Sequence, residues 1–189
     1  MKNSLGKKTI LLTHPVLVIG SYDETGRPNL MTASWGGICC SEPPCIAISI
    51  RKSRLSYKNI LHNEAFTVNI PSVKYLKETD FIGTQSGKNY DKFDICKLTP
   101  VKAEIVNAPY IQEFHLVLIC KLIHTTELGI HTQFIGEIVE SLVDDEYTNE
   151  KGLPSIEKIQ PFIYDTSVSA YYAIGNKIMD AFITKEFSK

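Results

Sequence analysis

Short apolar runs typical of β-strands, separated by turn-forming residues, recur along most of this chain. Residues 16–22 and 29–35 flank the turn segment 23–28, which contains Gly and Pro, so they predict a hairpin. Further strands are expected at 45–50, 64–71, 101–105, 113–124 and 134–142. Short helices are expected at 53–63 and 75–82. At least six strands with only short helices predict a mainly β protein, a closed or nearly closed antiparallel barrel with helical caps.

The size and charge of the chain restrict what it can bind and where it works. Its 189 residues fit one domain, and its net charge of −1 gives no field that favours nucleic acid or an anionic membrane. No apolar run is long enough to span a bilayer, and the first residues are too interrupted for a secretory signal. We therefore expect a cytoplasmic protein without nucleic-acid or membrane partners. Residues 174–187 are expected to form a terminal helix or a tail.

The cysteine pattern argues against a disulfide framework and a zinc site. The five cysteines are odd in number and contain no Cys-x-x-Cys pair. Cys96 and Cys120 are interpreted as apolar filler. Cys39 and Cys40 lie nearer the candidate pocket described next, so a redox role for them stays open.

Residues 31–44 contain small hydroxylated side chains, the single Trp, a Gly pair and a Pro pair. The strand-like run 45–51 follows and ends in Arg51. A polar loop with little side-chain bulk lets backbone N–H groups approach a phosphate or the edge of a ring, and a guanidinium matches phosphate oxygens. The segment therefore predicts one wall of a pocket for a flat phosphorylated ligand.

A helix-entry segment follows this wall and adds further phosphate-binding groups. Ser49, Arg51, Ser53 and Ser56 surround the start of the expected helix, where free N–H donors favour an anion. The alternative is a solvated Arg51–Lys52 pair with Ser53 as a simple helix cap. The spacing after Gly36 and Gly37 excludes a Walker or dinucleotide-binding glycine motif.

Two later segments add candidates. In the polar loop at 83–92, Ser86 and Lys88 could reach an anionic group, or the loop could be an exposed turn. His131 stands at the start of a strand, where it could hydrogen-bond a ligand carbonyl or approach a hydride donor, or could simply lie on the rim. No Ser-His-Asp order and no paired carboxylates indicate hydrolysis.

These motifs, taken in order, resemble the flavin reductase-like family. They are Thr32-Ala-Ser-Trp-Gly-Gly, Ser49-Ile-Arg-Lys, Ser56-Tyr-Lys-Asn-Ile, Phe66-Thr-Val-Asn-Ile-Pro, Ser86-Gly-Lys-Asn-Tyr-Asp-Lys-Phe and Gly129-Ile-His-Thr-Gln-Phe-Ile-Gly-Glu. The resemblance covers about 15–172 of a single domain spanning 1–189 and leaves a tail at 173–189. It implies a six-stranded antiparallel Greek-key split β-barrel with short capping helices, a homodimer, and FMN bound non-covalently near the subunit interface.

The resemblance also implies a set of FMN-binding positions and one catalytic position. His131 would lie close to the flavin ring as the catalytic residue, and no metal ligand is implied. The FMN-binding positions are Thr32, Ala33, Ser34, Trp35, Ser49, Ile50, Arg51, Ser53, Ser56, Ser86 and Lys88. Ile130 stands where reductases of the family often have an Asp before the His, and this departure favours the flavoredoxin-type branch.

The implied function is that of an oxidoreductase or electron-transfer flavoprotein, which passes hydride or electrons through FMN. The donor would be NAD(P)H or a reduced electron-transfer protein. An FMN-binding module without NAD(P)H turnover, used for flavin storage or sensing, is the alternative. A related barrel oxidase acting on a pyridoxine phosphate fits the motifs around Ser86 and His131 poorly.

Overall fold

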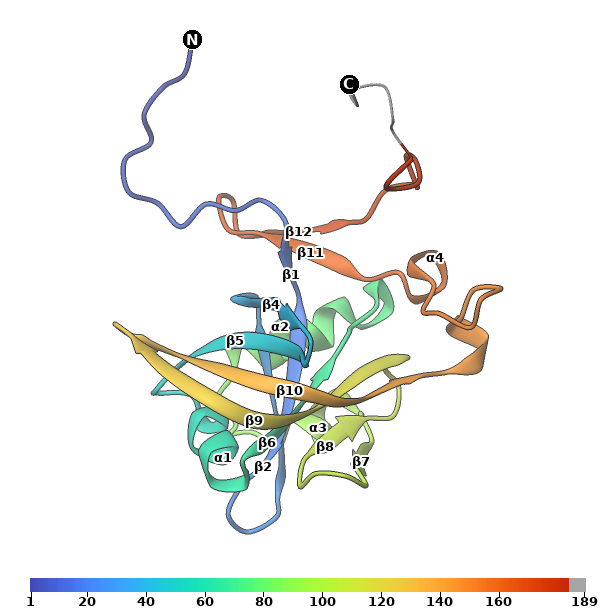
Figure 1. Ribbon diagram of the computed structural model, residues 1–189. Coiled ribbons are helices and arrows are strands. Elements are labelled where there is room, and N and C mark those ends of the chain that lie inside the picture. The colour runs from blue at the N-terminus through green and yellow to red at the C-terminus, as the bar shows by residue number, and fades with distance from the viewer. Residues whose placement is uncertain (184–189) are drawn as a thin grey trace.

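The main body of the protein is a strongly curled antiparallel β-sheet, seen in a computed structural model that describes residues 1–183 (Figure 1). Seven strands form it in the order β3-β2-β6-β9-β10-β5-β4. Their bounds are β2 (Leu17–Tyr22), β3 (Pro28–Ala33), β4 (Gly36–Ser41), β5 (Pro44–Arg51), β6 (Ala65–Asn69), β9 (Leu116–Leu128) and β10 (His131–Val143). The expected hairpin around the turn 23–28 is confirmed as β2 and β3, which pair from Leu17↔Ala33 to Tyr22↔Pro28.

The expected count of six strands is wrong, because residues 36–41 form a strand and not part of a loop. β4 pairs with β5, with Gly36 opposite Ile48. A Cβ at Gly36 would lie 2.8 Å from the Ala47 carbonyl oxygen, so glycine here allows two strands to approach closely. Gly36 therefore serves strand pairing, which a reading of glycine as a turn signal misses.

The sheet also does not close into a ring of strand pairs, since β3 and β4 are its two edges. The connection between them crosses the open side. There the Ser49 N–H donates to the Trp35 carbonyl oxygen at 2.8 Å, which ties the connection to β5. The open side is thus narrowed by a backbone contact beside the segment that the sequence marks as a pocket wall.

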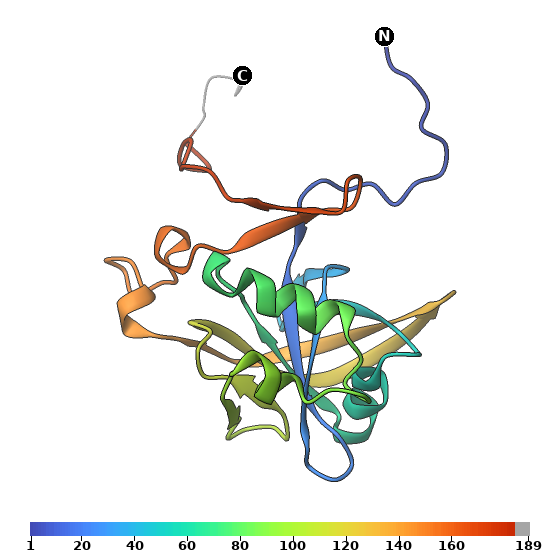
Figure 2. The same ribbon diagram turned by 180° about the vertical axis from the view of Figure 1, so that it is seen from behind.

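Apolar side chains fill the inside of the curl. Ile19, Ile48, Phe66 and Phe134 are fully buried in this cluster. A second cluster, which includes Leu30, Ile82 and Phe93, lies between the sheet and the two helices that contain Ile82 and Phe93 (Figure 2). The helices are α1 (Leu55–Asn63), α2 (Leu76–Thr84), α3 (Lys92–Cys96) and α4 (Ile156–Ile159), with short 3-10 turns at Val73–Tyr75 and Asp145–Tyr147. The helices expected at 53–63 and 75–82 are confirmed as α1 and α2, whereas α3 lies where the loop at 83–92 was expected to end.

A small separate sheet covers one side of the main body (Figure 1). It joins β1 (His14–Pro15) to β11 (Phe162–Asp165) and β12 (Ala170–Ala173), so segments from near both ends of the described chain meet in it. β7 (Pro100–Lys102) and β8 (Pro109–Ile111) form a two-stranded ribbon elsewhere. We refer to β1, β11 and β12 together as the roof.

Residues 174–183 contain no helix, and the rest of the expected terminal helix, 184–187, lies outside the described residues. Within residues 1–183, every helix is too short or too polar to cross a bilayer.

Candidate functional site

A cavity of about 580 Å³ lies where the open side of the curled sheet meets the roof. Its lining comes from five places in the sequence. Two of these places are strand ends: 31–35 at the end of β3, and Ser49, Ile50 and Arg51 at the end of β5, followed by Arg54. The other three are Asp80, Gly83 and Thr84 on α2; His131 at the start of β10; and Tyr164, Ser169 and Tyr171 in the roof. A cavity of this size falls within the usual range for cofactor sites.

The wall at 32–35 is held by contacts on both of its sides. The Thr32 hydroxyl donates to the Thr79 carbonyl oxygen on α2 at 2.6 Å. On the roof side, His14 Nδ1 donates to the Ser34 carbonyl oxygen at 3.2 Å, and the His14 ring stacks on Trp35 with 4.7 Å between centroids. Together with the Ser49–Trp35 bond, these contacts fix the wall before any ligand arrives.

Two guanidinium groups border the cavity without carboxylate partners. The ion pairs of residues 1–183 include neither Arg51 nor Arg54. Arg54, not Ser53, occupies the N-cap position of α1, and neither a capping side chain nor an acidic residue covers the first turn. The free N–H groups of a helix start and two unpaired cations leave this corner strongly positive.

A narrow cleft continues from the cavity, and Arg54 lines both. Asn29, Ser56, Ser86 and Lys92 also line the cleft. Ser56 is buried, and its hydroxyl accepts a bond from the Asn29 amide at 2.9 Å. A Cβ at position 87 would collide with the Asn29 side-chain oxygen, so Gly87 lets the 86–88 turn come this close.

Lys92 is the most unusual side chain of the cleft, because its ammonium group is buried with no carboxylate beside it. The residue is only 4% exposed, and Nζ donates to the carbonyl oxygens of Leu30 at 2.9 Å and Ile82 at 2.6 Å. Burial, and secondarily the charge of Arg54, lowers the pKa of Lys92 to about 8. An ammonium has three donors, so one is left for a ligand, and an anion there would compensate the charge.

His131 begins β10, as expected, and lines the cavity opposite Arg51 in the strand register. Burial and the Arg51 charge lower the pKa of His131, so its imidazole is neutral at pH 7. Ile130, in the turn before it, is 66% exposed and lines neither the cavity nor the cleft.

The roof closes the cavity with aromatic side chains. Tyr164 and Tyr171 lie 5.3 Å apart between ring centroids. The Tyr171 hydroxyl donates to Asp80 Oδ1 on α2 at 3.0 Å. Burial, and then the bond to Asp80, raises the pKa of Tyr171, so the phenol stays a donor at all physiological pH values.

The predicted site residues divide into three groups. The structure places Thr32, Ala33, Ser34, Trp35, Ser49, Ile50, Arg51 and His131 in the cavity lining. Ser56 and Ser86 lie in the cleft, whereas Ser53 and Lys88 are exposed and line neither space. Sequence reasoning missed Arg54, Asp80, Lys92, Tyr164 and Tyr171. The motif 86–93 contains both Lys88 and Lys92, but the sequence analysis selects Lys88.

The side chains of the site suit an organic anion and not a metal ion. Over residues 1–183, His, Cys, Asp and Glu side chains form no group of three or more that could hold a metal. The cavity offers a polar wall, aromatic rings above it and a positive corner at one end. These are the surroundings expected of a flat ligand that carries a phosphate.

Comparison with known proteins identifies the family. The sequence model of the flavin reductase like domain matches residues 10–170, so the chain belongs to the flavin reductase-like family. Flavoredoxin of Desulfovibrio vulgaris (Miyazaki F) is 46% identical, with a TM-score of 0.93, over 97% of this chain and 98% of that one. Flavoredoxin from Methanosarcina acetivorans is 27% identical, with a TM-score of 0.91, over 98% of both chains.

A curated relative, the uncharacterized protein YddH of Escherichia coli K12, is 33% identical over 71% of this chain and 73% of its own length. The expected family is confirmed, and the curled seven-stranded sheet has the same fold as these flavoredoxins.

Proposed function

We propose that this protein binds FMN non-covalently and works as an oxidoreductase or electron carrier of the flavoredoxin type. The buried, uncompensated ammonium of Lys92 is the observation that carries the proposal. A flavin-binding family member with such a cation at the end of its cavity needs an anionic ligand group there. FMN has a phosphate on the end of its ribityl chain, whereas riboflavin has none.

Residues of suitable chemistry lie at both ends of the cavity. The cleft has a free volume of only about 10 Å³, so a phosphate would lie at its mouth. Lys92, Arg54, Ser56 and Ser86 would hold the phosphate with the first turn of α1. The wall at 32–35 and the ends of β5 and β10 would face the ring, with the roof tyrosines on the other side. Bound flavin supplies the chemistry, since it accepts a hydride or single electrons.

The chain's own residues would orient the ring and adjust its electrostatic surroundings. Arg51 and the neutral His131 stand next to each other across β5 and β10, where both can donate hydrogen bonds to ring oxygens or nitrogens. A fixed cation at a ring edge favours the anionic reduced form of a flavin. His131 therefore serves as a neutral hydrogen-bonding group in this proposal, with Arg51 as the charge.

Three further parts of the proposal concern partners and the reaction. The protein forms a homodimer, and NAD(P)H or a reduced electron-transfer protein donates the electrons. Ile130, in place of an Asp beside His131, favours the electron carrier over an efficient nicotinamide-dependent reductase.

A reconstitution and reduction experiment tests the proposal. Apoprotein is titrated with FMN and with riboflavin, and the complex is then titrated anaerobically with NADH, NADPH or a reduced electron-transfer protein while the flavin absorbance is followed. We expect FMN to bind far more tightly than riboflavin and at least one donor to reduce it. Equal affinity for both flavins contradicts the phosphate assignment. Tight FMN binding with no reduction by any donor would instead indicate a storage or sensing module.

A further inference from the structure

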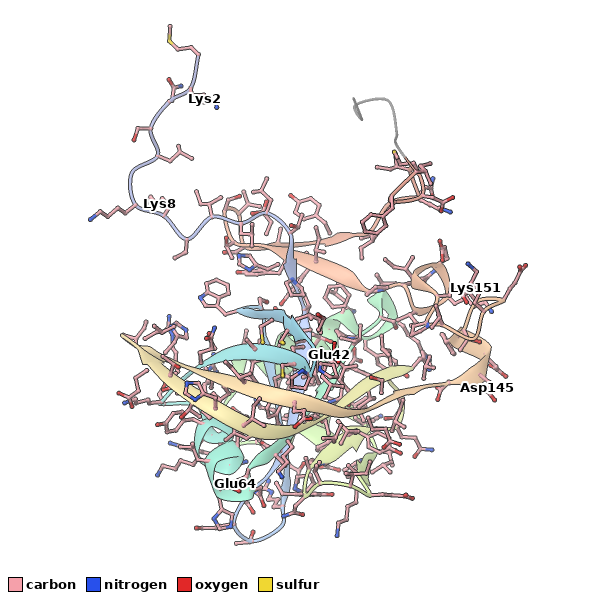
Figure 3. The ribbon with its side chains drawn as sticks, in the orientation of Figure 1. Lys2, Lys8, Glu42, Glu64, Asp145 and Lys151 are labelled. Carbon is pink, nitrogen blue, oxygen red and sulfur yellow. The ribbon has the colours of Figure 1, made fainter. Side chains whose placement is uncertain are left out.

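Three of the five cysteines gather in one hairpin, away from the cavity lining. Cys39 and Cys40 are exposed on β4, and Cys45 is buried at the start of β5, where it is 3% exposed. The turn that joins these strands contains Glu42, which is labelled in Figure 3. None of the three side chains lines the cavity or the cleft.

The strand register places Cys40 directly opposite Cys45. Directly opposed residues of antiparallel strands have Cα atoms about 4.5 or 5.5 Å apart, depending on the type of pair. Both spacings fall inside the range of about 4.4–6.8 Å that disulfides require. The Cβ atoms of such pairs are about 4.5–5.5 Å apart and those of a disulfide about 3.8 Å, so closure needs an approach of roughly 1 Å.

The position of β4 makes this approach feasible. β4 is an edge strand of the sheet, so no further strand of the described chain holds its outer side. The irregularity between Ile38 and Cys40 leaves Cys39 without a partner on β5, so Cys40 alone faces Cys45. Ser41 and Pro44 pair next to the turn and keep the two cysteines in register.

The thiols of Cys96 and Cys120 compete poorly with an exposed thiol for reaction with a disulfide. Burial raises the pKa of Cys96 to about 11 and that of Cys120 to about 12, so both stay protonated near neutral pH. Burial also raises the pKa of Cys45, and the neighbouring Cys40 and Cys39 raise it further. An exposed thiol therefore reacts first, and Cys45 follows only when its partner is already activated.

We propose that Cys40 and Cys45 form a dithiol–disulfide site that exchanges with low-molecular-weight disulfides. The Cys40 thiolate attacks one sulfur of the disulfide, which forms a mixed disulfide and releases one small thiolate. The Cys45 thiol then loses its proton and attacks the Cys40 sulfur, which releases the second small thiolate. Overall, two protein thiols are oxidised to one disulfide, and the small disulfide is reduced to two thiols.

The test uses glutathione disulfide as the probe and a Cys39→Ser, Cys96→Ser background, which leaves Cys40, Cys45 and the buried Cys120. Intact mass and thiol titration after denaturation are measured before and after exposure. We expect the background protein to lose two thiols without gaining mass from glutathione. With Cys45→Ser added, the resolving thiol is absent, and we expect one stable glutathione adduct on Cys40.

The matched control adds Cys40→Ser to the same background, and we expect neither an adduct nor any loss of thiols. A disulfide that forms in the wild type but not in the Cys39→Ser, Cys96→Ser background would show that the bond requires Cys39 or Cys96, and it would overturn the proposal. An adduct that persists on Cys40 although Cys45 is present would overturn it too. Circular dichroism of each variant confirms that the fold is kept, and this site stands or falls independently of flavin binding.

Discussion

The two ends of the cavity are built differently. The cleft around Lys92 is part of the folded body: its cation is buried and bonded to two backbone carbonyls, and Ser56 and Asn29 hold each other beside it. The roof belongs to a separate sheet. Within residues 1–183, one side-chain hydrogen bond, Tyr171 to Asp80, joins it to α2, and another, His14 to the Ser34 carbonyl oxygen, joins it to the wall. Free energy of binding should therefore depend mostly on the cleft, and the rate of ligand release on the roof.

The largest expected effect is that of Lys92→Met on FMN affinity. The change removes a charge-assisted contact to phosphate, so FMN binding should weaken by about 3 kcal/mol, whereas riboflavin binding should change little. Isothermal titration with both flavins measures this. The control is Lys88→Met, an exposed lysine of the preceding turn, which should leave both affinities unchanged. A similar loss for both flavins would show that Lys92 supports the fold and not the phosphate.

The protonation of Lys92 gives the cleft a pH dependence. The pKa of Lys92 in the free protein is about 8, below its ordinary value, so the ammonium loses its proton as pH rises through 8. Binding a phosphate requires the charged form, so FMN affinity should fall about tenfold per pH unit above pH 8. Fluorescence titrations between pH 7 and about 9.5 measure the slope. Riboflavin affinity should stay flat, and so should FMN affinity in Lys92→Met.

Arg51→Ala should have an intermediate effect. If the guanidinium contacts phosphate, FMN binding weakens by about 1.5–3 kcal/mol and riboflavin binding changes little. If Arg51 faces the ring, as its place opposite His131 supports, both flavins lose affinity equally. Lys52→Ala is the matched control, because Lys52 is exposed and paired with Glu127. The two outcomes show whether Arg51 acts on the phosphate together with Arg54 or on the ring.

Tyr171→Phe should have the smallest effect on affinity and a clear effect on kinetics. Loss of the bond to Asp80 removes about 1 kcal/mol from the attachment of the roof, so FMN release should accelerate by roughly fivefold. Stopped-flow fluorescence of released FMN gives the rate. Tyr172→Phe alters the exposed neighbour and should leave the rate unchanged. An unchanged rate in Tyr171→Phe would mean that the roof does not limit release.

The sequence was sufficient for the local features of this site. The hairpin at 16–35, the wall at 32–35 and the place of His131 at a strand start follow from turn residues and apolar runs, which act over short distances. β4 was missed because Gly36 serves close strand packing, a feature that depends on Ala47 across the pair. No local pattern marks such a contact.

The long-range features of the site could not be predicted in this way. Asp80 and Tyr171 are 91 positions apart in sequence, and Lys92 reaches the Leu30 carbonyl across 62 positions. A lysine in a charged segment is normally solvated, but this one is buried where α3 meets β3 and α2, and it bonds to Leu30 and Ile82. Lys88 and Ser53, which the loop position, the helix entry and the family resemblance suggested as FMN-binding residues, are exposed and line neither space. Side-chain chemistry was recognisable from the sequence, but burial was not.

The roof has a consequence for how the protein acquires its ligand during synthesis. A ribosome makes the residues of the positive corner and the wall, all within residues 28–92, well before it makes β11 and β12. β1 pairs with a strand that is made nearly 150 positions later, since Pro15 pairs with Ile163. The nascent chain therefore exposes the anchoring groups while their cover is still untranslated. In the proposed complex, the groups that anchor FMN are therefore made before the roof side chains that face its ring.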